Sequence, residues 1–99
     1  MTNLTDADLS HANLTNFSLS ISTLTGADFT DANISGASLS QSAITLPQLY
    51  STASYKTRDL SNVGMSAVDL AGASFVGQNL SNAGFTYSNL TGADFRQAN

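Results

Sequence analysis

The chain has 99 residues, enough for a single domain, and its formal net charge is −4. All seven acidic residues are Asp, so the surface is mildly acidic and direct binding to the phosphate backbone of nucleic acids is not expected. The lack of cysteine excludes disulfide bonds and thiolate metal sites.

The N-terminal segment "MTNLTDADLS" has no basic region followed by an apolar run, so it is unlike a secretory signal peptide. No apolar stretch approaches the roughly 18 residues that a membrane span needs. We therefore expect a soluble chain without membrane contact. It is cytoplasmic as written, and exported if it is a fragment of a longer protein.

Apolar residues recur every five positions through the first half of the chain. Neither a helix, with a period of 3.6, nor a strand, with a period of 2, has this spacing. Two positions before each apolar centre the residue is usually small, as at Ala7 and Ala27, and the residue after the centre is Ser or Thr. Short units of this kind bury nothing alone and must stack as a solenoid. The centres are Leu4, Leu9, Leu14, Leu19, Leu24, Phe29, Ile34, Leu39 and Ile44.

The period is interrupted once, around "LPQLYST", and returns one step out of phase. Taking Tyr55 as the next centre makes residues 47–52 an insertion. The alternative, with Leu49 as the centre, is disfavoured because it puts Pro47 where other units have a small inward residue. We therefore interpret the chain as one domain. It spans residues 1–99, with repeat blocks 2–46 and 53–97.

The interrupted segment carries helix signals. Thr45 and Gln48 have the spacing of a capping box, and the apolar residues that follow fall on one helical face. We expect a short helical insertion near residues 46–53, on the outside of the solenoid. Leu49 and Tyr50 are candidate contacts for a partner, although sealing the corner is the commoner role of such a face.

The second half of the chain repeats the pattern, and its units can be assigned in rotation to four walls. Each wall then shows its own signature, which favours four units per coil and about 4.5 coils for the whole chain. The second wall predicts an aromatic stack, because its centres read Leu9, Phe29, Tyr55, Phe75 and Phe95. On the third wall the residues before the centres are Asn13, Asn33, Asp59, Asn79 and Asn99.

These units resemble the pentapeptide-repeat family, whose pattern A-(D/N)-L-x-x is seen here in "ADLSH", "ANLTN", "ADFTD" and "GADFR". The resemblance covers almost the whole chain. It implies an all-β fold, a right-handed quadrilateral parallel β-helix with four units per coil. Arg58 and Gln78 depart from the pattern by replacing the small inward residue of the third wall. We expect the coil to bend there so that the guanidinium reaches solvent, because an unpaired buried charge is not tolerated.

Enzyme activity is not expected from this composition. His11 is the only histidine, Lys56 is the only lysine and glutamate is absent, so a nucleophile with a positioned base can hardly be assembled. Several aspartates gather on the second wall, but a flat wall offers too few converging oxygens for calcium. We therefore predict no catalytic residues, no cofactor and no metal ligands.

The fourth wall is the candidate interaction face, because it has small residues and no charge. A neutral wall that simply faces solvent is about equally expected. The residues of this face are Ser18, Ser20, Ile21, Ser38, Ser40, Gly64, Ser66, Gly84 and Tyr87.

Two kinds of partner fit a solenoid of this type. The first is an unidentified protein, or a second copy of the chain stacked end to end, because the repeats start and stop without polar caps. The alternative is an acidic mimic of DNA that binds a DNA-handling enzyme such as gyrase, as some pentapeptide-repeat proteins do. A net charge of −4 falls well short of the charge on a duplex of similar length.

Overall fold

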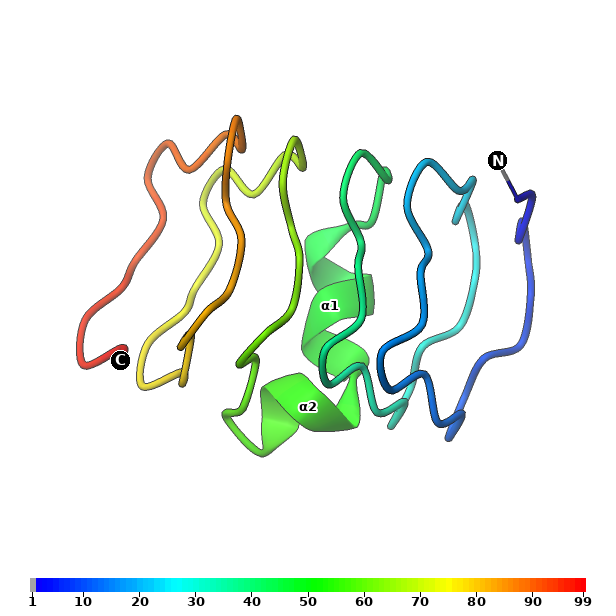
Figure 1. The fold of residues 1–99 in the computed structure, drawn as a ribbon, viewed down its shortest axis with the longest axis horizontal. Coiled ribbons are helices and arrows are strands. Elements are labelled where there is room, and N and C mark those ends of the chain that lie inside the picture. The colour runs from blue at the N-terminus through cyan, green and yellow to red at the C-terminus, as the bar shows by residue number, and fades with distance from the viewer. Residues whose placement is uncertain (1) are drawn as a thin grey trace.

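The computed structural model describes residues 2–99 as a stack of coils measuring 33 × 25 × 20 Å. The two ends of the chain lie at opposite ends of the long axis, and two short helices lie in the middle (Figure 1). Helix α1 spans Leu46–Ser51 and helix α2 spans Ala53–Lys56. The coils are held together by isolated parallel β-bridges, and no longer strand is formed within residues 2–99.

The regular coil contains four five-residue units. Bridges join residues 20 apart, such as Asn3 to Thr23 and Asp8 to Asp28. Each corner is turned by a residue with positive φ, beginning with Asp6 at 58° and His11 at 59°. Asn and Asp tolerate this conformation, whereas a β-branched residue such as Ile21, with φ of 59°, is strained there.

Side chains also stabilise the corners, which explains the polar residues on either side of each centre. The backbone N–H of Thr5 donates to Asn3 Oδ1 with an N···O distance of 3.0 Å, and the Thr5 hydroxyl donates to the same oxygen at 2.6 Å. Ser10 makes the same pair of bonds to Asp8 Oδ1. Asn or Asp before the centre and Ser or Thr after it therefore form a local turn motif.

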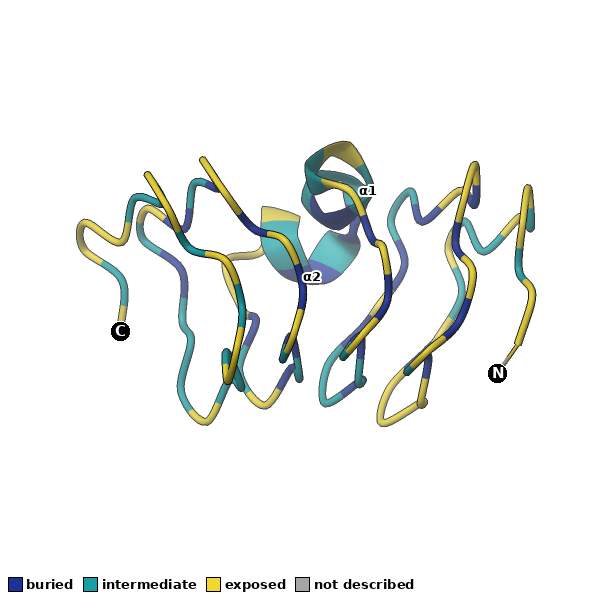
Figure 2. Ribbon diagram, turned by 90° about the horizontal axis from the view of Figure 1, so that it is seen from above, coloured by how far each residue is buried: buried dark blue, intermediate teal, exposed yellow. Residues whose placement is uncertain are grey.

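The apolar centres fill the interior of the coil. Burial is complete in the middle coils and falls off toward both ends (Figure 2). Leu4 and Leu9 at one end, and Phe85 and Leu90 at the other, are only partly buried, while Phe95 is 39% exposed. The core is therefore best packed around the helices.

The fourth wall differs from the other three in its backbone pairing. Its bridges run without interruption from Ser18 to Ser38, Gly64 and Gly84. On each other wall, the bridges among residues 2–99 form one group before the helices and one after them. The molecule thus consists of an N-terminal half (residues 2–45) and a C-terminal half (residues 58–99), joined by a continuous ladder along the fourth wall. The bridges on the interrupted walls are Asn3–Thr23 and Asp69–Asn89, Asp8–Asp28 and Ser74–Asp94, and Asn13–Asn33 and Asp59–Asn79.

Helix α1 replaces a unit of the second wall, and Leu49 takes the inward position. The N–H of Ala53 donates to the carbonyl of Ala32, the same 21-residue separation that joins Asn33 to Ala12 in the regular coil. The chain therefore keeps its register through Ala53, and the extra residues follow it. Leu49 is completely buried in the core.

The prediction that Tyr55 is an inward centre was wrong. Tyr55 lies in α2 and is only partly buried, because α2 forms after the register has been kept through Ala53. The rest of the aromatic prediction is confirmed in part, since the rings of Phe75 and Phe95 stack with centroids 5.3 Å apart. Deletion variants can decide whether residues 47–52 are dispensable.

The two departures from the small inward residue behave differently. Arg58 is exposed, as the cost of burying its charge predicts. Gln78 is buried, and its Nε2 donates to the carbonyl of Tyr55 at 3.0 Å while its Oε1 has no hydrogen-bond partner. The carbonyl of α2 therefore stabilises only half of this buried amide.

Candidate interaction surfaces

The helices cap the exposed edge of the N-terminal half. Thr45 and Gln48 form the predicted capping box at the start of α1. Gln48 Nε2 also donates to the carbonyls of Leu24, at 2.7 Å, and Ala27, at 3.0 Å. The Ala27 carbonyl accepts no backbone hydrogen bond within residues 2–99, so the glutamine satisfies an acceptor that a neighbouring strand would otherwise have paired. The Leu24 carbonyl already accepts from the N–H of Ala27.

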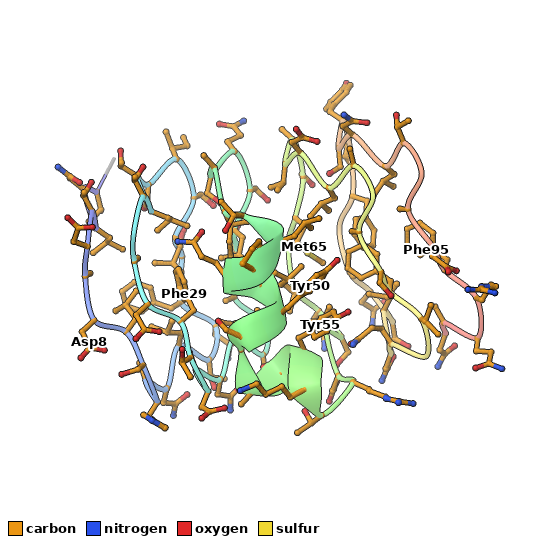
Figure 3. All side chains as sticks on the ribbon, turned by 180° about the vertical axis from the view of Figure 1, so that it is seen from behind. Asp8, Phe29, Tyr50, Tyr55, Met65 and Phe95 are labelled. Atoms are coloured by element: carbon orange, nitrogen blue, oxygen red, sulfur yellow. The ribbon has the colours of Figure 1, made fainter. Side chains whose placement is uncertain are left out.

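Two tyrosines cap the facing edge of the C-terminal half at one residue, Ser74. The N–H of Ser74 donates to the Tyr50 hydroxyl at 2.9 Å, and the Tyr55 hydroxyl donates to the Ser74 carbonyl at 2.6 Å. The two rings pack with centroids 4.7 Å apart. Burial raises the pKa of Tyr55, so its hydroxyl stays protonated and able to donate. Figure 3 shows both tyrosines beside the helices, on the side of the coils that lead to Phe95.

These contacts correct the predicted role of the helical insertion. Leu49 was a candidate contact for a partner, but its side chain is completely buried and has no surface to offer. Tyr50 is half-buried, and its hydroxyl is engaged with Ser74. The insertion packs between the two halves, which is the commoner role for an apolar helical face.

The candidate face on the fourth wall is built from small side chains that contact one another between coils. The hydroxyl oxygens of Ser20 and Ser38 are 2.6 Å apart, and the N–H of Ser66 donates to Ser40 Oγ at 3.2 Å. A Cβ added at Gly64 would lie 3.4 Å from both Ser38 Oγ and Ser40 Oγ, at the edge of ordinary contact. This wall is therefore low and continuous across both halves.

Three larger exposed residues flank this wall, Phe17 and Ile21 toward one end of the molecule and Tyr87 toward the other, and Phe17 is 55% exposed. Ile21 in the first coils is 52% exposed, and Tyr87 near the C-terminal end is 93% exposed. Both turn corners with positive φ, at 59° and 62°. They are separate apolar points beside the wall and not one continuous patch.

The charged side chains lie on other parts of the surface, and two of the three cations are paired. Lys56 Nζ lies 2.7 Å from Asp31 Oδ1, and an Arg96 nitrogen lies 2.7 Å from Asp94 Oδ2. His11 Nδ1 is 3.9 Å from the same Asp31 carboxylate. The Lys56 contact lowers the pKa of Asp31. Residues 2–99 contain no group of three or more His or Asp side chains that could hold a metal ion.

The carboxylates of the second-wall aspartates accept hydrogen bonds within the turn motif. Asp8 and Asp28 face each other in a bridge. Hydrogen bonds from Ser10 and Thr30 lower the pKa of Asp8 and Asp28, respectively.

Neither helix described by the structure is long and apolar enough to cross a membrane.

A notch of about 290 Å³ opens in the third wall, beside α2. It lies where a bridge between Asn33 and Asp59 would be expected from the rest of the wall, but none forms. Sequence reasoning missed this notch. The available signal was Asp59, the one acid in a wall whose other residues at that position are Asn. The lining residues are Asn33, Ser35, Ala53, Ser54, Thr57 and Asp59.

The repeats, the stacked coils and the turn motif agree with comparison to known sequences. The family model for pentapeptide repeats matches residues 2–41 and 59–99, in 8 copies. The chain therefore belongs to the pentapeptide-repeat family. The match omits residues 42–58, which contain both helices.

Two solved structures are similar to this chain. One is HetL, a pentapeptide repeat protein involved in heterocyst differentiation regulation from the cyanobacterium Nostoc sp. strain PCC 7120, with 26% identity and a TM-score of 0.47. The other is a pentapeptide repeat protein from the thylakoid lumen of Arabidopsis thaliana, with 28% identity and a TM-score of 0.38. The matches cover 97% and 95% of this chain, but only 44% and 65% of those proteins. A search of curated proteins gave no match.

Proposed function

We propose that this chain is a non-enzymatic interaction module and that its fourth wall docks against a partner protein. The supporting observation is that this wall combines an unbroken backbone ladder with no charged side chain. Small residues let another backbone approach closely, and the lack of charge removes a desolvation cost. The family membership supports an interaction role, and it also supports a right-handed quadrilateral β-helix as the form of the coil.

The arrangement of polar residues supports a role without catalysis. The interior is filled by apolar side chains, and the one histidine, His11, lies exposed at a corner beside Asp31. No Ser or Thr hydroxyl is hydrogen-bonded to His11 in residues 2–99. A nucleophile activated by a base would require such a contact.

Photo-crosslinking compares the fourth wall with the second wall, which lies opposite it. A photoreactive amino acid replaces Ser18 on the fourth wall or Asp8 on the second wall of the same coil, in cells that naturally encode the protein. We expect a partner to crosslink from position 18 and not from position 8. Binding of that purified partner should then be lost in the Gly64→Lys variant. Equal crosslinking from both positions, or unchanged binding of the Gly64→Lys variant, would contradict the proposal.

Mimicry of DNA is the second candidate, and the distribution of charge weakens it. Over the 33 Å length of the molecule, duplex DNA would carry about 19 negative charges, against a net charge of −4 here. Two of the seven aspartates, Asp31 and Asp94, are neutralised by ion pairs. A gyrase supercoiling assay separates the candidates, since inhibition at submicromolar protein would favour mimicry.

A second copy of the chain is a further possible partner, through stacking of coil ends. The support is the partial exposure of Leu4 at one end and of Leu90 and Phe95 at the other. Such stacking buries apolar centres and pairs free backbone groups in a head-to-tail contact. Size-exclusion chromatography with light scattering should show mass increasing with concentration. A constant monomer mass would rule this partner out.

A further inference from the structure

The third-wall notch exists because α2 diverts the backbone and Ser54 takes over the missing pairing. The N–H of Ile34 donates to Ser54 Oγ at 2.9 Å, and the N–H of Asp59 donates to the Ser54 carbonyl at 2.9 Å. These backbone groups are thus satisfied without a bridge between Asn33 and Asp59. The two coils remain apart at this place, and the side chains between them are left facing the notch.

One hydroxyl beside the notch lacks a hydrogen bond that its equivalents make in several other units. In six other units the hydroxyl after the centre donates to the Asn or Asp before it. Ser35 and Thr91 make only the backbone bond. For Ser35 it runs from the N–H to Asn33 Oδ1 at 3.0 Å, and the Ser35 hydroxyl has no hydrogen-bond partner within residues 2–99. The six hydroxyls that are engaged belong to Thr5, Ser10, Thr15, Thr30, Ser61 and Ser81.

Asp59 supplies a negative charge at the other side of the notch. Its Oδ1 accepts from the N–H of Ser61, at 3.1 Å, and from the Ser61 hydroxyl, at 2.6 Å, while its Oδ2 makes no hydrogen bond within residues 2–99. The bonds from Ser61 lower the pKa of Asp59, so the carboxylate is ionised at neutral pH. No cation within residues 2–99 forms a salt bridge with this carboxylate. Lys56 pairs with Asp31 and Arg96 pairs with Asp94, while the Arg58 guanidinium lies against Gly77.

We propose that this notch binds the guanidinium of an arginine side chain presented by a partner protein. Five of the six lining residues carry side-chain oxygens, and only Asn33 adds a side-chain nitrogen donor. A guanidinium offers five N–H donors, no acceptor and a permanent positive charge, which complements this set. The volume of about 290 Å³ is at the lower end for ligand sites, which suits a side chain better than a cofactor.

The site is separate from the fourth wall, so either proposal can fail without the other. Its test needs no partner: a blocked arginine, N-acetyl-arginine-N-methylamide, is titrated into the full chain while backbone amide shifts are followed by NMR. The amides of Ser35, Thr57 and Asp59 should move in a saturable way. Blocked citrulline, which has the same shape but no charge, should bind at least about fivefold more weakly, and blocked lysine should bind more weakly than arginine.

Asp59→Asn is the decisive variant, because Asn occupies the same position at Asn13, Asn33 and Asn79 and forms the same turn there. It should weaken arginine binding at least about fivefold, whereas Asp69→Asn should not. Asp69 lies on the first wall, where it bridges Asn89, and the variant removes an equal charge away from the notch. Ser35→Ala removes only the free hydroxyl and should weaken binding about twofold to threefold.

Three results would overturn the proposal. The first is equal loss in Asp59→Asn and Asp69→Asn, which would indicate general attraction to an acidic surface. The second is lysine or citrulline binding as tightly as arginine. The third is shift changes spread over the second wall and not centred on the notch.

Discussion

The second and fourth walls of the same coil solve the interruption in opposite ways. On the second wall a unit becomes helix α1, and glutamine and tyrosine side chains take over the pairing of the neighbouring coils at Ala27 and Ser74. On the fourth wall the ladder passes from Ser38 to Gly64 across 26 residues with no loss of pairing. Because a helix is wider than a strand, α1 separates the coils on either side of it along the second wall. The direct pairing between the two halves therefore lies on the opposite, fourth wall. The fourth wall thus holds the two halves together.

The largest expected difference is between two six-residue deletions in the interrupted region. Deleting residues 54–59 leaves Leu49 as a centre, restores the five-residue period and frees the Ala53 carbonyl to accept from Ile34 in place of Ser54. This variant should fold. Deleting residues 47–52 also restores the period but removes Leu49 and Gln48, so we expect loss of cooperative unfolding. Circular dichroism melts would show it, and two equally stable deletions would contradict the observed register.

Leu49→Ala should have the largest effect of any single substitution in the helices. Leu49 is completely buried, and truncating such a leucine costs about 2–5 kcal/mol. Leu46→Ala, in the same helix but only partly buried, is the matched control and should cost less. Urea unfolding measures both. A cost below about 1 kcal/mol for Leu49→Ala would mean that Leu49 is not the second-wall centre.

Removing the tyrosine hydroxyls tests the cap on the C-terminal half. Tyr50→Phe leaves the N–H of Ser74 unpaired, and Tyr55→Phe leaves the carbonyl of Ser74 unpaired. Each variant should therefore lower the free energy of unfolding by about 1–2 kcal/mol. Tyr87→Phe is the control, because that residue is 93% exposed and should unfold like the wild type. If all three variants unfold alike in urea, the hydroxyls do not replace a strand.

Two glycine-to-alanine variants test how much room the fourth wall has for an added methyl group. Gly64→Ala adds a Cβ 3.4 Å from two serine oxygens, at ordinary φ, so the change in stability should stay within about 1 kcal/mol. Gly26→Ala, at φ of +71° and with its added Cβ overlapping Asp6 Oδ1, should destabilise by more. Thermal melts of the two variants should therefore separate, and equal losses would show that the fourth wall has no spare room.

The smallest effect concerns pH. Hydrogen bonds lower the pKa of Asp8, Asp28, Asp59 and Asp94 in the folded chain. A lowered folded-state pKa adds stability above the unfolded value, about 3.9, and that stability is lost as pH falls through the folded value. The melting temperature should hence be level near neutral pH and drop below about pH 4. Asp8→Asn keeps the turn and should reduce the drop, and an unchanged acid profile would contradict this assignment.

The repeat sequence by itself determined the coil. The five-residue spacing of Leu and Phe, the small residue two places earlier and the Asn or Asp beside each centre all act within one unit or between neighbouring coils. The capping box at Thr45 and Gln48 is equally local, so it could be predicted from the sequence. The resemblance to pentapeptide repeats rested on the same local pattern.

The tertiary structure alone decided which residues fill the interrupted unit. Leu49 and Tyr55 both restore the period, and the choice depends on whether helix α1 can satisfy backbone groups far away in the sequence. Gln48 does so at Ala27, and Tyr50 does so at Ser74. The third-wall notch was hidden for the same reason, because it opens where α2 and Ser54 keep two coils from pairing. Contacts that are made once and do not repeat from coil to coil leave no periodic signal in a sequence.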